Sequence, residues 1–219
     1  SAHIDEIGGL STELPTRIEP VQPTAFSSSD IAVIGMSLQT PGADNLDTFW
    51  QNLSDRNSGH TLEGKDLFDP SFFGLTDAEA RAMNPHQRLI MLEGWRAFED
   101  AGLNPWDLAG TRSAIYIGAE PCNWYEGSFT GASDAIIASR LSYLLDLKGP
   151  ALVINTGCSS SGTAIHLACE SLRRGEADLA LAGGVAASLS EESLGQLRDT
   201  EMLSPSKQCR SFANDADGM

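Results

Sequence analysis

Cys158 stands at the junction between a strand-like and a helix-like segment, where a thiol can act as a nucleophile. The apolar run 151–154 predicts a strand, residues 155–157 a tight turn, and the amphipathic stretch 163–174 a helix. Unpaired N–H groups and the positive dipole end of a helix start favour a thiolate, the nucleophilic form of cysteine. A free thiol is more often a small buried apolar residue, so these local features fit a catalytic and a structural cysteine equally well.

The remaining cysteines give weaker chemical signals. The spacing of the four cysteines matches no disulfide framework and no zinc pattern (Cys122, Cys158, Cys169 and Cys209). His166 and Cys169 lie one helical turn apart and could both face a metal, but no second ligand pair accompanies them, so core packing is the favoured interpretation. We therefore predict no metal site and no bound cofactor.

Composition narrows the class of protein and its partners. The 219 residues are 41% hydrophobic, which is enough for one sizeable core. Fourteen lysines and arginines against 30 aspartates and glutamates give a formal charge of −16, which disfavours nucleic acid and anionic membranes as partners. Neither a signal peptide nor a long apolar span is present, and we expect a reducing, cytoplasmic setting.

The chain is predicted to consist of a linker over residues 1–29 and a folded domain over 30–219. Three prolines and a serine run mark the linker (Pro15, Pro20, Pro23 and residues 27–29). In the folded part, apolar runs predict strands over 31–36, 113–118, 151–154 and 178–182. Caps and periodicity predict helices over 46–53, from the capping box 76–79, from Asn84 to near Gly102, from a Ser133 cap to about Leu145, over 163–174 and over 191–200. Strands that alternate with helices indicate an α/β fold, with a mostly parallel sheet covered by helices.

The residues around Cys158 closely resemble the active-site motif of the β-ketoacyl synthases, the condensing enzymes of fatty-acid and polyketide synthesis. Residues 155–161 read NTGCSSS. Further segments fit the same family in the same order, at 34–36, 68–74, 83–89, 138–143, 182–185, 202–205 and 216–218. Their style is similar to that of the ketosynthase domains of type I modular polyketide synthases, and the chain resembles the N-terminal portion of such a domain.

The resemblance implies a fold, a reaction and partners. The fold is thiolase-like and layered, with this chain as its N-terminal half, and the complete domain is usually a homodimer. The resemblance makes Cys158 the nucleophile that takes an acyl group from the phosphopantetheine thioester of an acyl carrier protein, with its own backbone N–H holding the oxyanion. A malonyl unit on another carrier then loses carbon dioxide, and the carbanion attacks the acyl-cysteine in a decarboxylative Claisen condensation.

The resemblance places the catalytic histidines of the family outside this sequence. The family supplies two histidines from its C-terminal half, and the chain stops at Met219. We therefore expect it to need a C-terminal ketosynthase half, on the same or a separate chain, before it can condense. His166 follows Cys158 by roughly 12 Å of helical rise, too far for direct proton transfer, and His86, in a helix-start segment, and His60 and His3 are given no catalytic role.

The sequence departs from the family pattern at two residues near Cys158, and it leaves two alternative functions to be considered. Asn155 and Gly157 stand where the family usually has aspartate and alanine, which leaves acyl selectivity and rate undecided. The first alternative is a non-elongating ketosynthase-like domain that passes acyl chains between carriers. The second is a scaffold subunit, which retention of Cys158 argues against.

Overall fold

The computed structural model describes residues 29–55, 57, 62, 64, 67–122, 128–187, 199–200, 202–206 and 209–218. The predicted linker over 1–29 lies outside these residues except for Ser29, and the predicted helix over 191–200 lies outside them except for its last two residues. The chain divides after Asp30, and every element below belongs to the second unit.

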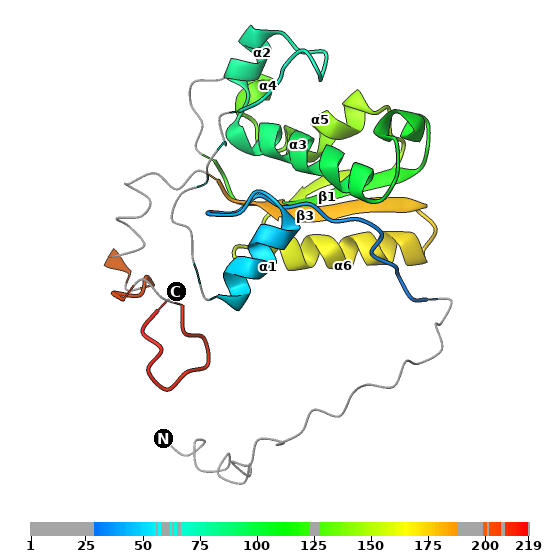
Figure 1. Cartoon of the computed structure of the whole chain (residues 1–219). Helices are drawn as coiled ribbons and strands as arrows, with labels where there is room; N and C mark the ends of the chain where they lie inside the picture. Colours follow the sequence, from blue (N-terminus) through cyan, green and yellow to red (C-terminus); the bar gives the residue numbers. More distant parts are fainter. Residues whose placement is uncertain are drawn as a thin grey trace, which may run out of the picture. The chain divides into compact units, whose positions relative to one another are not determined.

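A parallel sheet with helices on both faces confirms the predicted α/β architecture. In the described residues the sheet order is β2-β1-β3, formed by β1 (Ser113–Ala119), β2 (Ala151–Ile154) and β3 (Leu179–Val185). Both neighbours run parallel to β1. Figure 1 shows α3 (Pro85–Asp100) and α5 (Ile136–Leu144) on one face and α6 (Ser160–Arg173) on the other. The other helices are α1 (Leu46–Ser54), α2 (Asp77–Ala82), a 3-10 turn (Pro105–Leu108) and α4 (Phe129–Ala132).

Strand β1 lies at the centre of the core and is buried along its whole length. Side chains alternate across a strand, so Ile115 and Ile117 join the large apolar cluster under α3 and α5. Ala114 and Tyr116 face α6, where Ala164 is fully buried against them. Because most of the buried residues on this second face are alanines, α6 approaches the sheet closely.

The helix ends follow the predicted capping chemistry. The Thr76 hydroxyl accepts a hydrogen bond from the Glu79 N–H, and the Glu79 carboxylate accepts one from the Thr76 N–H, which completes the capping box of α2. Asn84 caps α3 through its side-chain oxygen, which accepts from the His86 N–H at 2.7 Å. Gly102 ends α3 with φ +73°, a left-handed conformation that favours glycine.

The predicted strand over 31–36 is wrong. These residues form no strand and are mostly exposed. The Met36 N–H donates to the Asp100 carboxylate at 2.8 Å, and a side chain on Gly35 would collide with the Ala97 carbonyl oxygen of α3. An apolar run becomes a strand only where a neighbouring strand takes up its backbone hydrogen bonds. In the described residues this segment meets a helix instead.

The predicted Ser133 cap is also wrong. Helix α5 begins at Ile136, and its N-cap residue is Ala135, without a side-chain cap hydrogen bond. Ser133 instead ends the short helix α4, and its carbonyl oxygen accepts from the Gln87 side chain at 2.9 Å. A tertiary contact from α3 thus fixes the segment in which local capping rules would have started α5.

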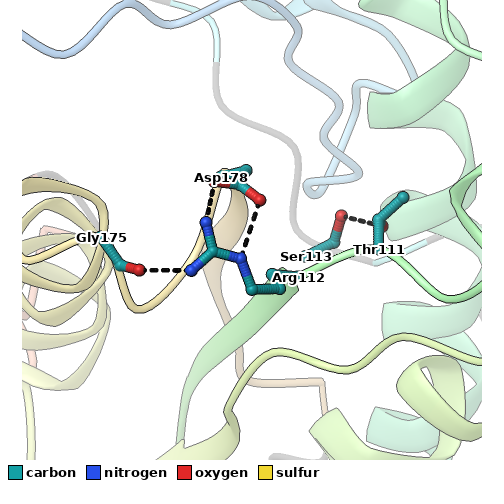
Figure 2. Close-up of polar contacts among 5 residues, drawn as sticks. All are labelled: Thr111, Arg112, Ser113, Gly175 and Asp178. Carbon is teal, nitrogen blue, oxygen red and sulfur yellow. Dashed lines mark hydrogen bonds and ion pairs between the residues drawn. The ribbon is translucent and has the colours of Figure 1, made fainter.

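An arginine clamp joins β1 and β3 at their amino ends (Figure 2). The Arg112 guanidinium donates to both carboxylate oxygens of Asp178, at 2.6 and 3.1 Å, and to the Gly175 carbonyl oxygen at 2.7 Å. Next to it, the Thr111 and Ser113 hydroxyls lie 2.8 Å apart. The clamp therefore fixes the turn that leads from α6 into β3.

We expect the Arg112 clamp to stabilise the fold only modestly, because the side chains of Arg112 and Asp178 are 55% and 64% exposed. A double-mutant cycle of Arg112→Ala and Asp178→Ala, followed by urea unfolding, should give a coupling of about 0.5–1 kcal/mol. Arg112→Lys should lose most of this coupling, because an ammonium cannot form the two-pronged contact. The control is Arg173→Ala, which removes a different arginine and breaks its ion pair with Glu170 within α6. A coupling above about 3 kcal/mol would contradict this assignment.

Candidate functional site

The carboxyl ends of the three strands come level at one edge of the sheet. In the strand register, Gly118 of β1 pairs with Ile154 of β2 on one side and with Gly184 of β3 on the other. In open α/β sheets this edge is where ligands bind. Residues 155–159 leave β2 at this edge and lead into α6, so the Cys158 turn lies where a site is expected.

Cys158 occupies the predicted place between β2 and α6 and carries an exposed, free thiol. The helix itself begins at Ser160, with Ser159 as its N-cap residue, so Cys158 lies one residue outside the cap. Cys122, by contrast, is buried, and Cys169 is half-buried. In the described part of the chain Cys158 is therefore not a buried packing residue.

The hydroxyl groups of the two serines after Cys158 form hydrogen bonds with the backbone of the two residues before it. The Ser160 hydroxyl donates to the Gly157 carbonyl oxygen at 2.6 Å and accepts from the Thr156 N–H at 2.9 Å. The Ser159 hydroxyl donates to the Thr156 carbonyl oxygen at 2.9 Å. Ser160 is 6% exposed, so water competes little for its two bonds, whereas the Ser159 bond is exposed. The thiol thus lies on a turn whose backbone is held by several side-chain hydrogen bonds.

The two departures from the family motif fit this turn geometry. The Asn155 side-chain oxygen accepts from the Gly157 N–H at 3.1 Å, a bond that an aspartate oxygen makes equally well. Gly157 has φ +65°, in the left-handed region where glycine carries no side-chain penalty. Both residues therefore support the turn that presents Cys158.

Two glycines let the first turn of α6 rest directly on the sheet. A Cβ atom on Gly118 would collide with the Ser160 carbonyl carbon and the Ser161 nitrogen. A Cβ atom on Gly184 would lie 2.7 Å from the Ser161 Cβ, closer than side-chain carbons approach. No side chain of β1 or β3 separates these strand ends from the helix start, so the sheet backbone sets the position of the Cys158 turn. The position of Gly118 at this contact was not foreseen from the sequence, since it needs the strand register.

The two described histidines lie in different surroundings. His166 lies exposed on α6. His86 is buried, and its Nε2 accepts a hydrogen bond from the Ala187 N–H at 3.0 Å. Burial holds the pKa of His86 below its ordinary value, and the carboxylate of Asp134 acts in the opposite direction. The contact between His86 and Ala187 joins residues 101 positions apart, and no local pattern signals it. His3 and His60 lie outside the described residues.

Among the described residues, no group of three or more histidine, cysteine, aspartate or glutamate side chains is arranged to hold a metal ion. None of the helices in this described part is both long enough and apolar enough to cross a membrane.

Comparison with known proteins shows one family over nearly the whole chain. The model of the β-ketoacyl synthase N-terminal domain matches residues 28–63 and 54–219. Polyketide synthase PksM of Bacillus subtilis (strain 168) is 36% identical over 86% of this chain, which spans 5% of that protein. The mycocerosic acid synthase-like polyketide synthase of Mycolicibacterium smegmatis is 41% identical over 73% of the chain, which spans 8% of it.

Solved structures show the same likeness in three dimensions. The ketosynthase from module 6 of the bacillaene synthase of Bacillus subtilis 168 superposes with a TM-score of 0.78 and 40% identity, over 85% of this chain and 36% of its own. The oxazolomycin ketosynthase domain OzmH KS7 of Streptomyces albus JA3453 gives 0.76 and 31%, over 85% of this chain and 39% of its own. The chain therefore spans less than half of these ketosynthases, with the same thiolase-like fold.

We predict that Gly118→Ala destabilises the fold by about 2 kcal/mol or more, because the added methyl group drives α6 off the sheet edge. Gly183→Ala is the matched control, since Gly183 lies on β3 one residue before the contact and has no atom within 4 Å of an added Cβ. It should change stability by no more than about 0.5 kcal/mol. Urea unfolding followed by circular dichroism measures both. Equal effects of the two substitutions would contradict the direct seating of α6.

Proposed function

The chain belongs to the β-ketoacyl synthase family, of the polyketide-synthase type, and we propose that Cys158 receives the acyl chain that such an enzyme extends. The acyl donor is the phosphopantetheine thioester of an acyl carrier protein. The observation that supports this proposal most directly is the exposed thiol of Cys158, presented by a hydrogen-bonded turn at the carboxyl edge of the sheet.

The acyl-transfer step follows from thiol chemistry. The Cys158 thiolate attacks the thioester carbonyl carbon, and a bond forms between Sγ and that carbon. The bond to the phosphopantetheine sulfur then breaks, and that sulfur takes up a proton and leaves as a thiol. The transient oxyanion needs donors that are already in place. The backbone N–H of Cys158 is our candidate, because the turn around it is tied by the Ser159 and Ser160 hydroxyls.

The condensation step needs groups that neither described histidine provides. His86 is committed to the Ala187 N–H. His166 is exposed on α6, six residues beyond the helix start at Ser160, which is roughly 9 Å of helical rise. We propose that the groups that assist loss of carbon dioxide from a malonyl-type extender come from a C-terminal ketosynthase half, on the same or a separate chain. The complete domain would then act as a homodimer with carrier proteins in the cytoplasm.

We expect Cys158 to be the cysteine that a thioester acylates. After brief exposure to S-hexanoyl-N-acetylcysteamine, a minimal mimic of acyl-phosphopantetheine, mass mapping should find the hexanoyl group on Cys158. Cys158→Ala should abolish loading, and Cys158→Ser should load at below about 1% of the wild-type rate, because a hydroxyl does not ionise as a thiol does. Cys209→Ala removes the other exposed cysteine and should load normally. Undiminished loading of Cys158→Ala would refute the assignment.

We also expect acylation without condensation when the 219-residue chain is supplied alone with hexanoyl- and malonyl-loaded carrier proteins. Carbon dioxide and β-ketoacyl product, followed by mass spectrometry, should appear only after a C-terminal ketosynthase half that carries both family histidines is added. Condensation by the chain alone would overturn this division of the chemistry. It would also direct attention back to His166, whose substitution by glutamine is the decisive variant in that case.

A further inference from the structure

We propose that His86 is a positioning residue for Cys158: its imidazole fixes the carboxyl end of β3, on which the nucleophile turn is seated. The inference rests on the proposed function, since it takes acylation of Cys158 as the reaction that the positioning serves. His86 itself does not touch the reacting atoms. Its action passes through the backbone of β3.

The first step is the contact between His86 and the residues that follow β3. His86 is the second residue of α3, and its Nε2 accepts the Ala187 N–H at 3.0 Å. Strand β3 ends at Val185, so Ala187 lies two residues past the last strand residue. His86 is 2% exposed, and Ala187 is half-buried, so the contact is partly shielded from water. A hydrogen bond within a protein contributes about 0.5–1.5 kcal/mol, so the contact constrains this chain segment.

The second step leads from Ala187 to the nucleophile turn. Gly184 precedes Ala187 by three residues, and its Cα face lies directly against Ser161 in the first turn of α6. Ser161 in turn follows Cys158 by three residues. A shift of the carboxyl end of β3 by a fraction of an ångström would therefore change its contact with the first turn of α6. Reactions that depend on a positioned nucleophile are sensitive to displacements of this size.

The third step is the fixation of His86 itself. The N-terminus of α3 is held by the fully buried side chains of Asn84 and Gln87. The Asn84 amide donates to the Asp134 carboxylate at 2.6 Å. The Gln87 amide donates to the carbonyl oxygens of three residues in the segment 130–133 at 2.9–3.0 Å and accepts from Arg140 at 2.7 Å. His86 therefore presents its Nε2 from a rigid helix start.

This arrangement requires a neutral imidazole. Nε2 accepts a hydrogen bond only when it carries no proton, which places the single proton of the ring on Nδ1. Burial favours the neutral form and holds the pKa below the ordinary value of 6.5, whereas Asp134, the charged group that acts on His86 from the segment before α5, favours the protonated form. Protonation would set two donors, Nε2–H and the Ala187 N–H, against each other. As the pH falls below 6.5 and through the lowered pKa, the hold on β3 should be lost.

The experiment measures the contact and its consequence separately in the full 219-residue chain. Hydrogen exchange at the Ala187 amide, read by NMR and expressed as a protection factor, reports the contact without any acylation. The rate of Cys158 acylation by S-hexanoyl-N-acetylcysteamine reports the consequence. The variants are His86→Gln, whose side-chain oxygen can replace Nε2 as acceptor, and His86→Leu, which has no acceptor. His166→Gln is the matched control on the exposed histidine of α6.

At pH 7.5, a value above the ordinary histidine pKa of about 6.5, we expect His86→Leu to lower the Ala187 protection factor and the acylation rate by about fivefold or more, as loss of one hydrogen bond implies. His86→Gln and His166→Gln should retain both. On acidification, Ala187 protection should fall through a step below pH 6.5 in the wild type and in His166→Gln, but not in His86→Gln. If His86→Leu does not fold, this comparison of wild type with His86→Gln decides the matter.

Two outcomes would overturn the inference. Unchanged Ala187 protection in a folded His86→Leu chain, or the same pH profile in wild type and His86→Gln, would show that His86 does not hold β3. A loss of Ala187 protection with undiminished acylation would show that the contact is structural only. Absence of acylation in every chain, with the protection pattern as expected, would instead refute the proposed function and leave the contact itself established.

Discussion

The close contact between the first turn of α6 and the bare backbone of β1 and β3 is the constraint on which the rest of the structure depends. A helix can lie this near a sheet only where the strands carry no side chain, as at Gly118 and Gly184. The small residues Ala114, Ala164 and Ala168 keep the same separation along the helix. The turn that carries Cys158 therefore takes its position from the sheet, the most buried part of the molecule.

Hydrogen bonds fix the geometry of the turn before α6, which apolar packing alone does not determine. The Ser160 hydroxyl accepts one backbone N–H and donates to one carbonyl of the turn, whereas the buried Ser171 hydroxyl on the same helix has no hydrogen-bond partner in the described part of the chain. The two Ser160 bonds restrict the backbone at Thr156 and Gly157.

Different polar contacts lie at the two ends of the same strands. At the amino ends, Arg112 and Asp178 form a solvent-exposed clamp whose contribution to the free energy of unfolding is small. At the carboxyl ends, the exposed turn that carries Cys158 is bonded to the buried Ser160 hydroxyl. This arrangement suits the proposed role of Cys158, because a nucleophile on a hydrogen-bonded turn needs little reorganisation to meet its substrate.

The sequence by itself determined those features whose causes lie within a few residues of one another. The Thr76 capping box, the Asn84 cap, the left-handed end of α3 at Gly102 and the order of strand, turn and helix around Cys158 all depend on neighbours along the chain. The family motifs likewise identified the ketosynthase class. Only the tertiary structure decided the features whose partners lie far apart. Residues 31–36 have the composition of a strand but meet α3, because pairing depends on which chain lies alongside. Gly118 matters through the register that sets it beneath α6, and His86 through an amide 101 residues away. Composition shows what a residue can do, whereas distance in space decides which of its possible partners it meets.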